Sequence, residues 1–325
     1  MEQAIRNFPK QFQWEPVIEN EGNLARTGMY LLCGMGGSHL QGDILQSVDP
    51  SVGLTLWQDY GLPSWSERKL KETLIIASSY SGNTEETISA FEEAIQKGYP
   101  VAAISTGGEV LSRAKHYGVP YIQIPDTRIQ PRSALGFAFK ALIKMVGRED
   151  LARQAAELAQ RLQARMRELE EQGKTLAEKL KGYIPVVYAS NRNHSVAYNW
   201  KIKFSETGKI PAFSNVFPEL NHNEMNGFDV SDSTRELCGK FHFILLKDAD
   251  DQPKIQKRME IVERLYRERK LPVTSVQLQG SSVLEKVFSS LLLADWAAYD
   301  IALHYKREPE QVAMVEEFKK LIAEK

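Results

Sequence analysis

The chain has 325 residues, a length that corresponds to about two domains. Apolar residues make up 42% and charged residues 26% of it, the balance of a globular protein with sizeable cores, which excludes disordered and fibrous polymers. The 41 basic and 42 acidic side chains leave a net charge of −1, so no overall basic field attracts nucleic acid or an anionic membrane.

The first residues, Met1 to Asn7, carry charges where a secretory signal needs an apolar stretch. The most apolar stretch, residues 287–303, is interrupted by Asp295 and Asp300. We therefore expect a cytoplasmic protein with no membrane segment.

Two cysteines, Cys33 and Cys238, lie far apart in the sequence, and no Cys-x-x-Cys or Cys/His cluster accompanies them. Buried thiols are the favoured interpretation, and a disulfide is the alternative. Because ligand spacing for zinc or another metal is missing as well, we expect no metal cofactor.

The N-terminal part of the chain alternates short apolar runs with helical patterns. Strands that alternate with helices through short turns are typical of an open, mostly parallel sheet with both faces covered. The predicted elements are strand 28–33, turn 34–38, helix 39–48, strand 73–78, turn 79–84, helix 85–97, strand 101–105, helix 110–117 and strand 120–124.

From about residue 133 the pattern becomes helical, and residues 149–181 are rich in Ala, Leu, Glu, Gln, Lys and Arg. This segment predicts a long amphipathic helix or a helical hairpin whose charges form a solvated face. A second α/β series follows, with strands at 184–189, 241–246 and 273–276 and helices at 253–269 and 283–305.

We therefore predict an α/β protein of two doubly wound domains, each a mostly parallel sheet flanked by helices. The predicted boundaries are 1–150 for an N-terminal domain, 151–182 for a helical connector and 183–325 for a C-terminal domain.

A hydroxyl-rich turn, Ser79-x-Ser81-Gly82-x-Thr84, stands between a predicted buried strand and a helix that begins at Glu85. Three hydroxyls and several backbone N–H groups at one helix N-terminus favour an anion, and Gly82 lets the backbone approach it closely. The turn therefore predicts a phosphate site. The alternative is a cluster of N-cap residues that only satisfies the donors of the helix.

A second glycine turn, residues 34–38, follows the first strand. It lacks the Gly-x-Gly-x-x-Gly spacing of dinucleotide-binding proteins and the lysine of a nucleotide-binding P-loop. Dinucleotide and ATP binding are therefore disfavoured, whereas a backbone wall around a small sugar fits this turn.

These two turns resemble those of sugar isomerase (SIS) domains. Two further segments, Pro131-Arg132-Ser133-Ala134-Leu135-Gly136 and residues 211–224, resemble signature segments of the bifunctional phosphoglucose/phosphomannose isomerases. The resemblance runs from about residue 20 to the C-terminus and implies two SIS domains in one chain.

The resemblance also implies a function. The expected enzyme is an aldose–ketose isomerase of carbohydrate metabolism, acting in glycolysis and gluconeogenesis. It interconverts glucose 6-phosphate and fructose 6-phosphate through an enediol and without a cofactor. Mannose 6-phosphate is a second candidate aldose. The alternatives are an SIS isomerase of another sugar phosphate and a non-catalytic sugar-phosphate sensor, which would not need a base.

Isomerisation through an enediol needs a base, a group that opens the sugar ring and a group that stabilises negative charge. By resemblance, Glu206 is the base and His222 opens the ring. From the residues alone, Glu206 reads as a surface carboxylate and His222 as part of a polar loop. Glu219 and Glu224 are rival carboxylates close to the histidine.

The remaining expected site residues also follow from the resemblance. Arg132 would stabilise charge on the enediolate, because a guanidinium stays protonated, and Lys319 would reach the site from the last helix. Ser38, Ser79, Ser81 and Thr84 would bind the phosphate, and Gly37 would line the sugar. Ordinary alternatives are a surface arginine and a solvated lysine.

The expected partner is a hexose 6-phosphate, and the family resemblance implies a homodimer in which His222 enters the partner's site. Two segments depart from the family pattern. Residues 308–312 read Glu-Pro-Glu-Gln-Val where an Asp-Pro-Thr-Pro-Val-like turn is usual, and residues 225–228 read Met-Asn-Gly-Phe where an apolar pair and a tryptophan are usual. Both segments are expected near the site, so both departures bear on whether the enzyme prefers the glucose or the mannose epimer.

Overall fold

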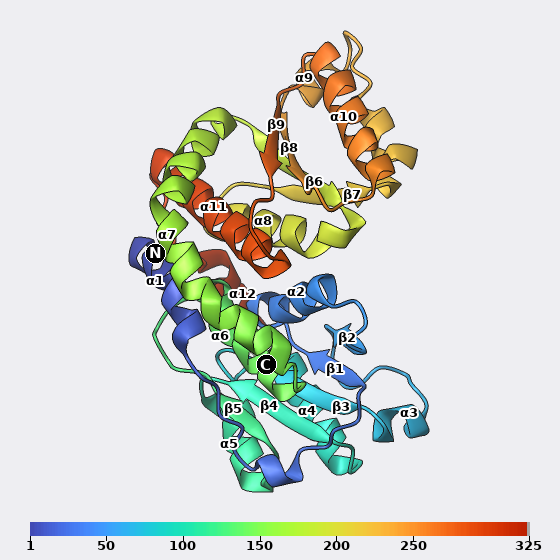
Figure 1. The fold of residues 1–325 in the computed structure, drawn as a ribbon, viewed down its shortest axis with the longest axis vertical. Helices are drawn as coiled ribbons and strands as arrows, with labels where there is room; N and C mark the ends of the chain where they lie inside the picture. Colours follow the sequence, from blue (N-terminus) through green and yellow to red (C-terminus); the bar gives the residue numbers. More distant parts are fainter. Residues whose placement is uncertain (324–325) are drawn as a thin grey trace. The chain divides into compact units, whose positions relative to one another are not determined.

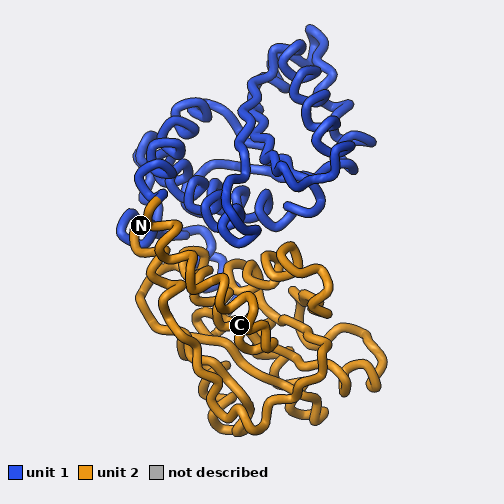
Figure 2. Tube along the Cα trace, in the orientation of Figure 1, with its two compact units in different colours: residues 1–5, 165–325 blue, residues 6–164 orange. Residues whose placement is uncertain are grey.

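The structure is a computed structural model that describes residues 1–323. It contains two compact units, coloured separately in Figure 2. Unit 2 comprises residues 6–164, and unit 1 comprises residues 1–5 together with the chain from Arg165 onward. The segment predicted as a helix or a hairpin is one continuous helix, α7 (Glu149–Leu180), and the two units divide within it. The predicted domain boundaries remain a prediction.

Unit 2 is built on a five-stranded sheet in which all strand pairs are parallel, in the order β2-β1-β3-β4-β5. Its strands β1, β3 and β4 are buried along their whole length, as expected for a parallel sheet with both faces covered. The strands are β1 (Tyr30–Cys33), β2 (Leu54–Trp57), β3 (Leu74–Ser78), β4 (Val101–Ser105) and β5 (Tyr121–Gln123). β2 was absent from the sequence prediction.

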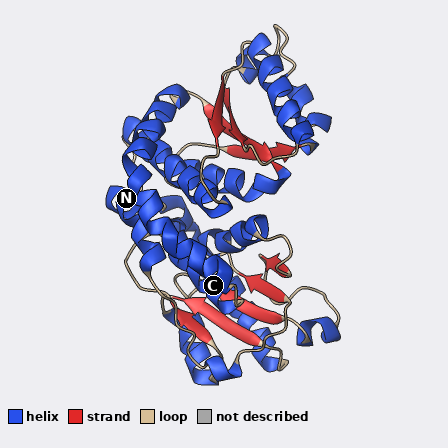
Figure 3. Cartoon of the chain, viewed as in Figure 1, coloured by secondary structure: helices blue, strands red, loops and turns tan. Residues whose placement is uncertain are grey.

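Helices cover both faces of this sheet (Figure 3). Leu31 and Ile75 pack in one core cluster with residues of α4 (Glu85–Gln96) and α5 (Gly108–Tyr117). Leu32 points the other way, toward α2 (Leu40–Val48), where a Cβ on Gly42 would lie 2.6 Å from the Leu32 side chain. The other helices of this part of the chain are α1 (Glu2–Asn7), α3 (Glu67–Lys71) and α6 (Leu135–Met145).

Unit 1 repeats the design with four parallel strands in the order β7-β6-β8-β9. The predicted fold class, two mostly parallel sheets flanked by helices, is confirmed. The strands are β6 (Ile184–Ser190), β7 (Phe213–Phe217), β8 (Phe241–Lys247) and β9 (Val273–Gln277), and the helices are α8 (His194–Glu206), α9 (Arg235–Cys238), α10 (Pro253–Glu268), α11 (Val283–His304) and α12 (Ala313–Ala323).

The strand order shows where each sheet has its topological switch point. In unit 2 the chain reverses its direction across the sheet between β1 and β3, and in unit 1 it does so between β6 and β8. In open α/β sheets, ligands bind in the crevice at the carboxyl ends of the strands where the strand order reverses. The glycine turn after β1 and the hydroxyl-rich turn after β3 therefore meet at the carboxyl edge of the unit 2 sheet, where a ligand is expected to bind.

Cys33 and Cys238 are both buried free thiols, as expected. Among the helices of residues 1–323, none combines the length and the apolarity that crossing a membrane requires.

Candidate active site

The turns that follow β1 and β3 are joined by hydrogen bonds. Ser38 Oγ accepts a hydrogen bond from the Tyr80 N–H at 2.9 Å. The buried Gln41 amide donates to the Ser38 carbonyl at 2.7 Å and to Ser78 Oγ at 2.8 Å. The two turns thus form one rigid surface, and Gln41 is a supporting residue that the sequence analysis missed.

The hydroxyls of the second turn differ in their contacts. Ser79 is fully buried, and its Oγ accepts from the Gly82 N–H at 3.0 Å and shares a hydrogen bond of 2.8 Å with Thr84 Oγ1. Thr84 occupies the N-cap position of α4, but its hydroxyl bonds to Ser79 instead of capping the helix. Ser81 is exposed, and its Oγ accepts from the Asn83 N–H at 3.3 Å. The first N–H groups of α4 are therefore not capped by Thr84, which favours an external anion over the simple capping role.

The turn after β4 holds this hydroxyl-rich turn from behind. Gly82 has φ +75°, and a Cβ there would lie 1.8 Å from the Gly107 carbonyl oxygen. Thr106 Oγ1 donates to the Tyr80 carbonyl at 2.7 Å, and the Val110 N–H donates to the Gly82 carbonyl at 2.9 Å. Glycine is thus required at position 82 both for its backbone conformation and for close contact.

A third segment, residues 131–133, completes this edge of unit 2. A Cβ on Gly37 would lie 2.9 Å from the Pro131 Cβ and 3.0 Å from the Arg132 backbone nitrogen, so the two segments touch. Arg132 is only 3% exposed. Gln11, a second residue that sequence reasoning missed, donates to the Ser133 carbonyl at 2.7 Å and accepts from the Gly136 N–H at 2.9 Å.

Unit 2 therefore brings together six of the nine predicted site residues at the carboxyl edge of β1 and β3. Hydroxyls and backbone N–H groups form a surface suited to an anion, and the backbone of Arg132 lies beside it. The six residues are Gly37, Ser38, Ser79, Ser81, Thr84 and Arg132.

Glu206, the predicted base, is the last residue of α8 in unit 1, and it is half-buried. The end of the helix is fixed: Lys203 forms a buried ion pair of 2.7 Å with Asp295 of α11. Lys209 Nζ donates to the Glu206 carbonyl at 2.6 Å and also to the Gln311 carbonyl. The turn 308–312, which departs from the family pattern, thus lies beside the backbone of Glu206.

His222, the predicted ring-opening residue, ends the 3₁₀ turn η6 (Glu219–His222) that follows β7. Its side chain is exposed and lines a cavity of about 510 Å³ together with Met225, Phe228 and Tyr266. The face of the sheet occupied by this segment is that of α10, because Leu220 packs in one cluster with Met259 of α10.

Within unit 1, Glu206 and His222 lie at opposite edges of the sheet. α8 runs back along the sheet to the amino edge, and β7 then runs forward to the carboxyl edge before His222. The five residues of β7 span about 13 Å at roughly 3.3 Å per residue. α8 and α10 also lie on opposite faces of the sheet (Figure 1). The structure therefore does not bring these two residues together within one unit.

The rival carboxylates have other partners. Glu224 Oε1 accepts from the Tyr188 hydroxyl, and Glu224 Oε2 accepts from the Asn215 amide at 2.6 Å. Glu219 Oε1 accepts from the Asn223 amide at 2.8 Å. Both oxygens of Glu224 thus already accept hydrogen bonds that tie this carboxylate to β6 and β7.

Lys319 lies on α12, where its side chain is exposed and pairs with Glu316 at 2.8 Å. Met314, Phe318 and Leu321 expose an apolar stripe on the same helix. Val315 and Ile322 widen this stripe, and at about 100° per residue Lys319 lies closer to its centre than Lys320 does.

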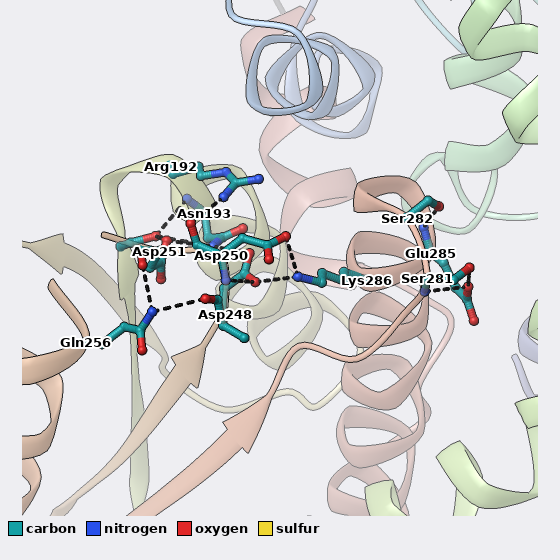
Figure 4. A network of polar contacts seen from close by, with 12 residues as sticks. Arg192, Asn193, Asp248, Asp250, Asp251, Gln256, Ser281, Ser282, Glu285 and Lys286 are labelled. Carbon is teal, nitrogen blue, oxygen red and sulfur yellow. Dashed lines mark hydrogen bonds and ion pairs between the residues drawn. The ribbon is translucent and has the colours of Figure 1, made fainter. Parts of the chain in front are cut away.

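At the corresponding edge of unit 1, between β6 and β8, carboxylates and their hydrogen-bond and ion-pair partners predominate (Figure 4). Ser190 donates to Asp251 at 2.6 Å, and Lys286 donates to Asp248 at 2.7 Å. Burial opposes ionisation of Asp248, but hydrogen bonds from Lys286 and Asn193 outweigh it and lower the pKa of Asp248. Burial raises the pKa of Asp251. The carboxylates make this edge less suited to a phosphate than the hydroxyl-rich edge of unit 2.

Throughout residues 1–323, no group of three or more His, Cys, Asp and Glu side chains lies close enough together to hold a metal ion.

Comparison with protein families matches residues 169–322 to the bacterial phospho-glucose isomerase C-terminal SIS domain, a range that lies within unit 1. A bifunctional phosphoglucose/phosphomannose isomerase from Aquifex aeolicus is 31% identical over 322 residues, covering 97% of the chain and 96% of the relative. The protein of the same name from Caldicellulosiruptor bescii is 33% identical over 343 aligned residues, covering 100% of the chain and 99% of the relative.

Among solved structures, the tagatose-6-phosphate ketose/aldose isomerase from Escherichia coli matches with a TM-score of 0.72 at 17% identity. The match covers 95% of the chain and 93% of that structure. At this identity the similarity concerns the fold alone.

Proposed function

The chain belongs to the bifunctional phosphoglucose/phosphomannose isomerase family, and we propose that it interconverts glucose 6-phosphate and mannose 6-phosphate with fructose 6-phosphate. The observation that carries this proposal is the similarity to such isomerases along the whole chain, at 31–33% identity. The hydroxyl-rich edge of unit 2 supports it independently, because that edge suits the phosphate of the substrate.

In the proposed mechanism, the phosphate binds to the N–H groups at the start of α4 and to the hydroxyls of Ser38, Ser81 and Thr84, with Ser79 beneath them. Ser38 Oγ already accepts a hydrogen bond from Tyr80, so its own proton can be donated to the phosphate. Gly37 lets the 131–132 segment pack directly against the glycine turn, since a Cβ there would clash with Pro131, and its backbone is proposed to line the sugar. These contacts hold the substrate without a metal.

Glu206 is the proposed base. It takes the proton from C2 of the open-chain aldose while O1 gains a proton, and the electron pair of the broken C–H bond forms the C1–C2 double bond of the enediol. The proton then returns at C1, O2 loses its proton, and the ketose results. Arg132 stabilises the negative charge that develops on the oxygens. Because the substrate is oxidised at C2 and reduced at C1, no redox cofactor takes part.

Glucose and mannose 6-phosphates differ only at C2, and this centre becomes planar in the enediol. Both aldoses therefore pass through the same intermediate and yield the same ketose. One base can serve both epimers if the C1–C2 group of the bound sugar turns relative to Glu206.

The separation of Glu206 from His222 within unit 1 supports the proposed homodimer. The two residues lie at opposite edges of one sheet, so the His222 that opens the ring comes from the second copy. A two-fold symmetric dimer then has two equivalent sites, each with one Glu206 and one His222. Lys319 is a further proposed contributor from α12.

The proposal is tested by a coupled assay with glucose 6-phosphate, mannose 6-phosphate and tagatose 6-phosphate as separate substrates, on protein treated exhaustively with EDTA. We expect turnover of the first two and little of the third. Turnover of tagatose 6-phosphate alone would assign the chain to a different sugar phosphate. Loss of activity that zinc restores would contradict the metal-free mechanism, and absence of any turnover with retained binding would favour a sensor.

A further inference from the structure

Glu224 lies two residues after His222 and joins the His222 segment to two strands of the sheet. Its Oε1 accepts from the Tyr188 hydroxyl of β6, and its Oε2 accepts from the Asn215 amide of β7 at 2.6 Å. The side-chain oxygen of Asn215, Oδ1, in turn accepts from the Val216 N–H at 2.8 Å, which fixes the orientation of the side-chain amide. Both carboxylate oxygens of Glu224 therefore face donors of fixed direction.

The Tyr188 hydroxyl, which donates to Glu224, belongs to a buried side chain. Tyr188 is fully buried in the core cluster under α10, and burial raises the pKa of its hydroxyl, so the hydroxyl keeps its proton at neutral pH. A buried hydroxyl without an acceptor is costly, which makes the carboxylate at position 224 hard to replace.

The segment that carries His222 is anchored on both sides of the histidine. Before it, Leu220 is fully buried in the core. After it, Glu224 makes the two hydrogen bonds to the strands. Two other side-chain hydrogen bonds of this segment are exposed: Asn223 donates to Glu219 at 2.8 Å, and Asn221 accepts from Arg258 at 3.2 Å. The half-buried contact from the Asn221 amide to Met225 Sδ, at 3.7 Å, stays within the segment. Exposed contacts of this kind add little to rigidity.

We propose that Glu224 is a positioning residue for His222. Its carboxylate fixes the segment against β6 and β7, so that the imidazole is presented in one orientation to the sugar ring. This inference rests on the proposed role of His222 in ring opening. It adds Glu224 as the residue that connects the His222 segment to the sheet. Glu224 itself does not contact the substrate.

The first test replaces Glu224 by Gln, with Glu219→Gln as the matched control from the same segment. An amide offers one acceptor where the carboxylate offers two, so Glu224→Gln places an N–H group opposite the Asn215 amide or removes the acceptor of Tyr188. We expect kcat to fall about 10- to 100-fold, since a hydrogen bond to a charged group is lost. KM and the affinity for 6-phosphogluconate, an open-chain acid that needs no ring opening, should change less than about two-fold.

The second test restores the pairing. In the double variant Glu224→Gln/Asn215→Asp, the amide accepts from Tyr188 and donates to the new carboxylate, so most of the lost kcat should return. A double-mutant cycle with His222→Ala should show that Glu224→Gln causes no further loss once the histidine is absent.

Hydrogen exchange of residues 219–228 separates this inference from the proposed function. We expect exchange to accelerate at least ten-fold in Glu224→Gln, and not in Glu219→Gln or the double variant. A wild-type protein without isomerase activity would defeat the proposed function, but the exchange rates would still decide whether Glu224 holds the segment. Unchanged exchange in Glu224→Gln, a kcat no lower than that of Glu219→Gln, or a parallel loss of 6-phosphogluconate affinity would each overturn the inference.

Discussion

At the scale of single residues, the hydroxyls of the turn 79–84 divide the work. Ser79 and Thr84 bond to each other and hold the turn, whereas Ser81 is exposed at its tip. A hydroxyl that keeps the turn in shape cannot be removed without disturbing the neighbouring donors. Ser81 is therefore the residue whose loss should report on phosphate binding alone.

Ser81→Ala should weaken phosphate binding while the fold persists. A hydrogen bond to a charged partner is worth about 1.5–3 kcal/mol, so the dissociation constant of glucitol 6-phosphate should rise roughly 10- to 150-fold. The affinity for unphosphorylated glucitol serves as the control and should not change. Equal penalties for both ligands, or none for either, would mean that the phosphate binds elsewhere.

Glu206→Gln keeps the shape of the side chain but removes the proton acceptor. Turnover should fall by about 10²- to 10⁴-fold, the usual contribution of a positioned base, while the affinity for glucitol 6-phosphate stays the same. The comparison variant is Glu219→Gln, which should remain active. Near-normal turnover in Glu206→Gln would return the role of base to another carboxylate.

At the scale of secondary structure, the order of the strands decides which turns meet. The turns after β1 and β3 come together because these strands are neighbours, although about 40 residues separate them in sequence. In unit 1, Glu206 ends α8 at the amino edge of the sheet, and β7 then carries the chain to the carboxyl edge before His222. The connection between helix and strand therefore separates the two residues. The carboxylates of Asp248 and Asp251 fill the equivalent edge of unit 1.

His242 of β8 should make stability depend on pH. It is 4% exposed, its Nε2 lies 2.9 Å from Thr274 Oγ1, and burial lowers its pKa from 6.5 to about 4. Between these two values the unfolded chain binds more protons than the folded chain. The free energy of unfolding should therefore fall as the pH drops through this window, by about 2 kcal/mol between pH 7.5 and 4.5.

Urea unfolding at the two pH values measures this effect. His242→Gln should lose about 2 kcal/mol less than the wild type over the same range, because its side chain does not titrate. The exposed His304 provides the control, and His304→Gln should follow the wild type. A pH dependence in His242→Gln equal to that of the wild type would show that other groups account for it.

At the scale of the whole molecule, the proposed sites require two copies of the chain. Neither Glu206→Gln nor His222→Ala homodimers should be active, because each lacks one group in both sites. A mixed dimer of the two variants has one site with both groups intact and one with neither.

Mixing the two inactive variants, with subunit exchange by mild urea and dialysis, should restore activity. Random exchange makes about half of the dimers mixed, and each has one intact site of two, so about a quarter of the wild-type activity is expected. Each variant carried alone through the same treatment is the control. Persistent inactivity of the mixture would mean that both groups act from one chain.

The sequence by itself was enough to predict most strands and helices of both units and the fold class, because buried parallel strands read as short apolar runs between helical patterns. The hydroxyl-rich turn and the glycine turn were also evident, since their chemistry is local to a few consecutive residues. β2 and β7 were missed, because their residues are partly exposed and lack a continuous apolar run.

Only the tertiary structure decided which distant segments meet. Gln11 and Gln41 support the candidate phosphate site through hydrogen bonds to segments far along the chain or on a neighbouring turn, and no local pattern marks such a residue. Glu206 and His222 are only sixteen positions apart in the sequence, yet the chain crosses the sheet between them, so they emerge at opposite edges. Strand pairing is set by burial and register over the whole unit. The edge of the sheet at which a residue lies therefore depends on contacts with distant segments, which the local sequence does not reveal.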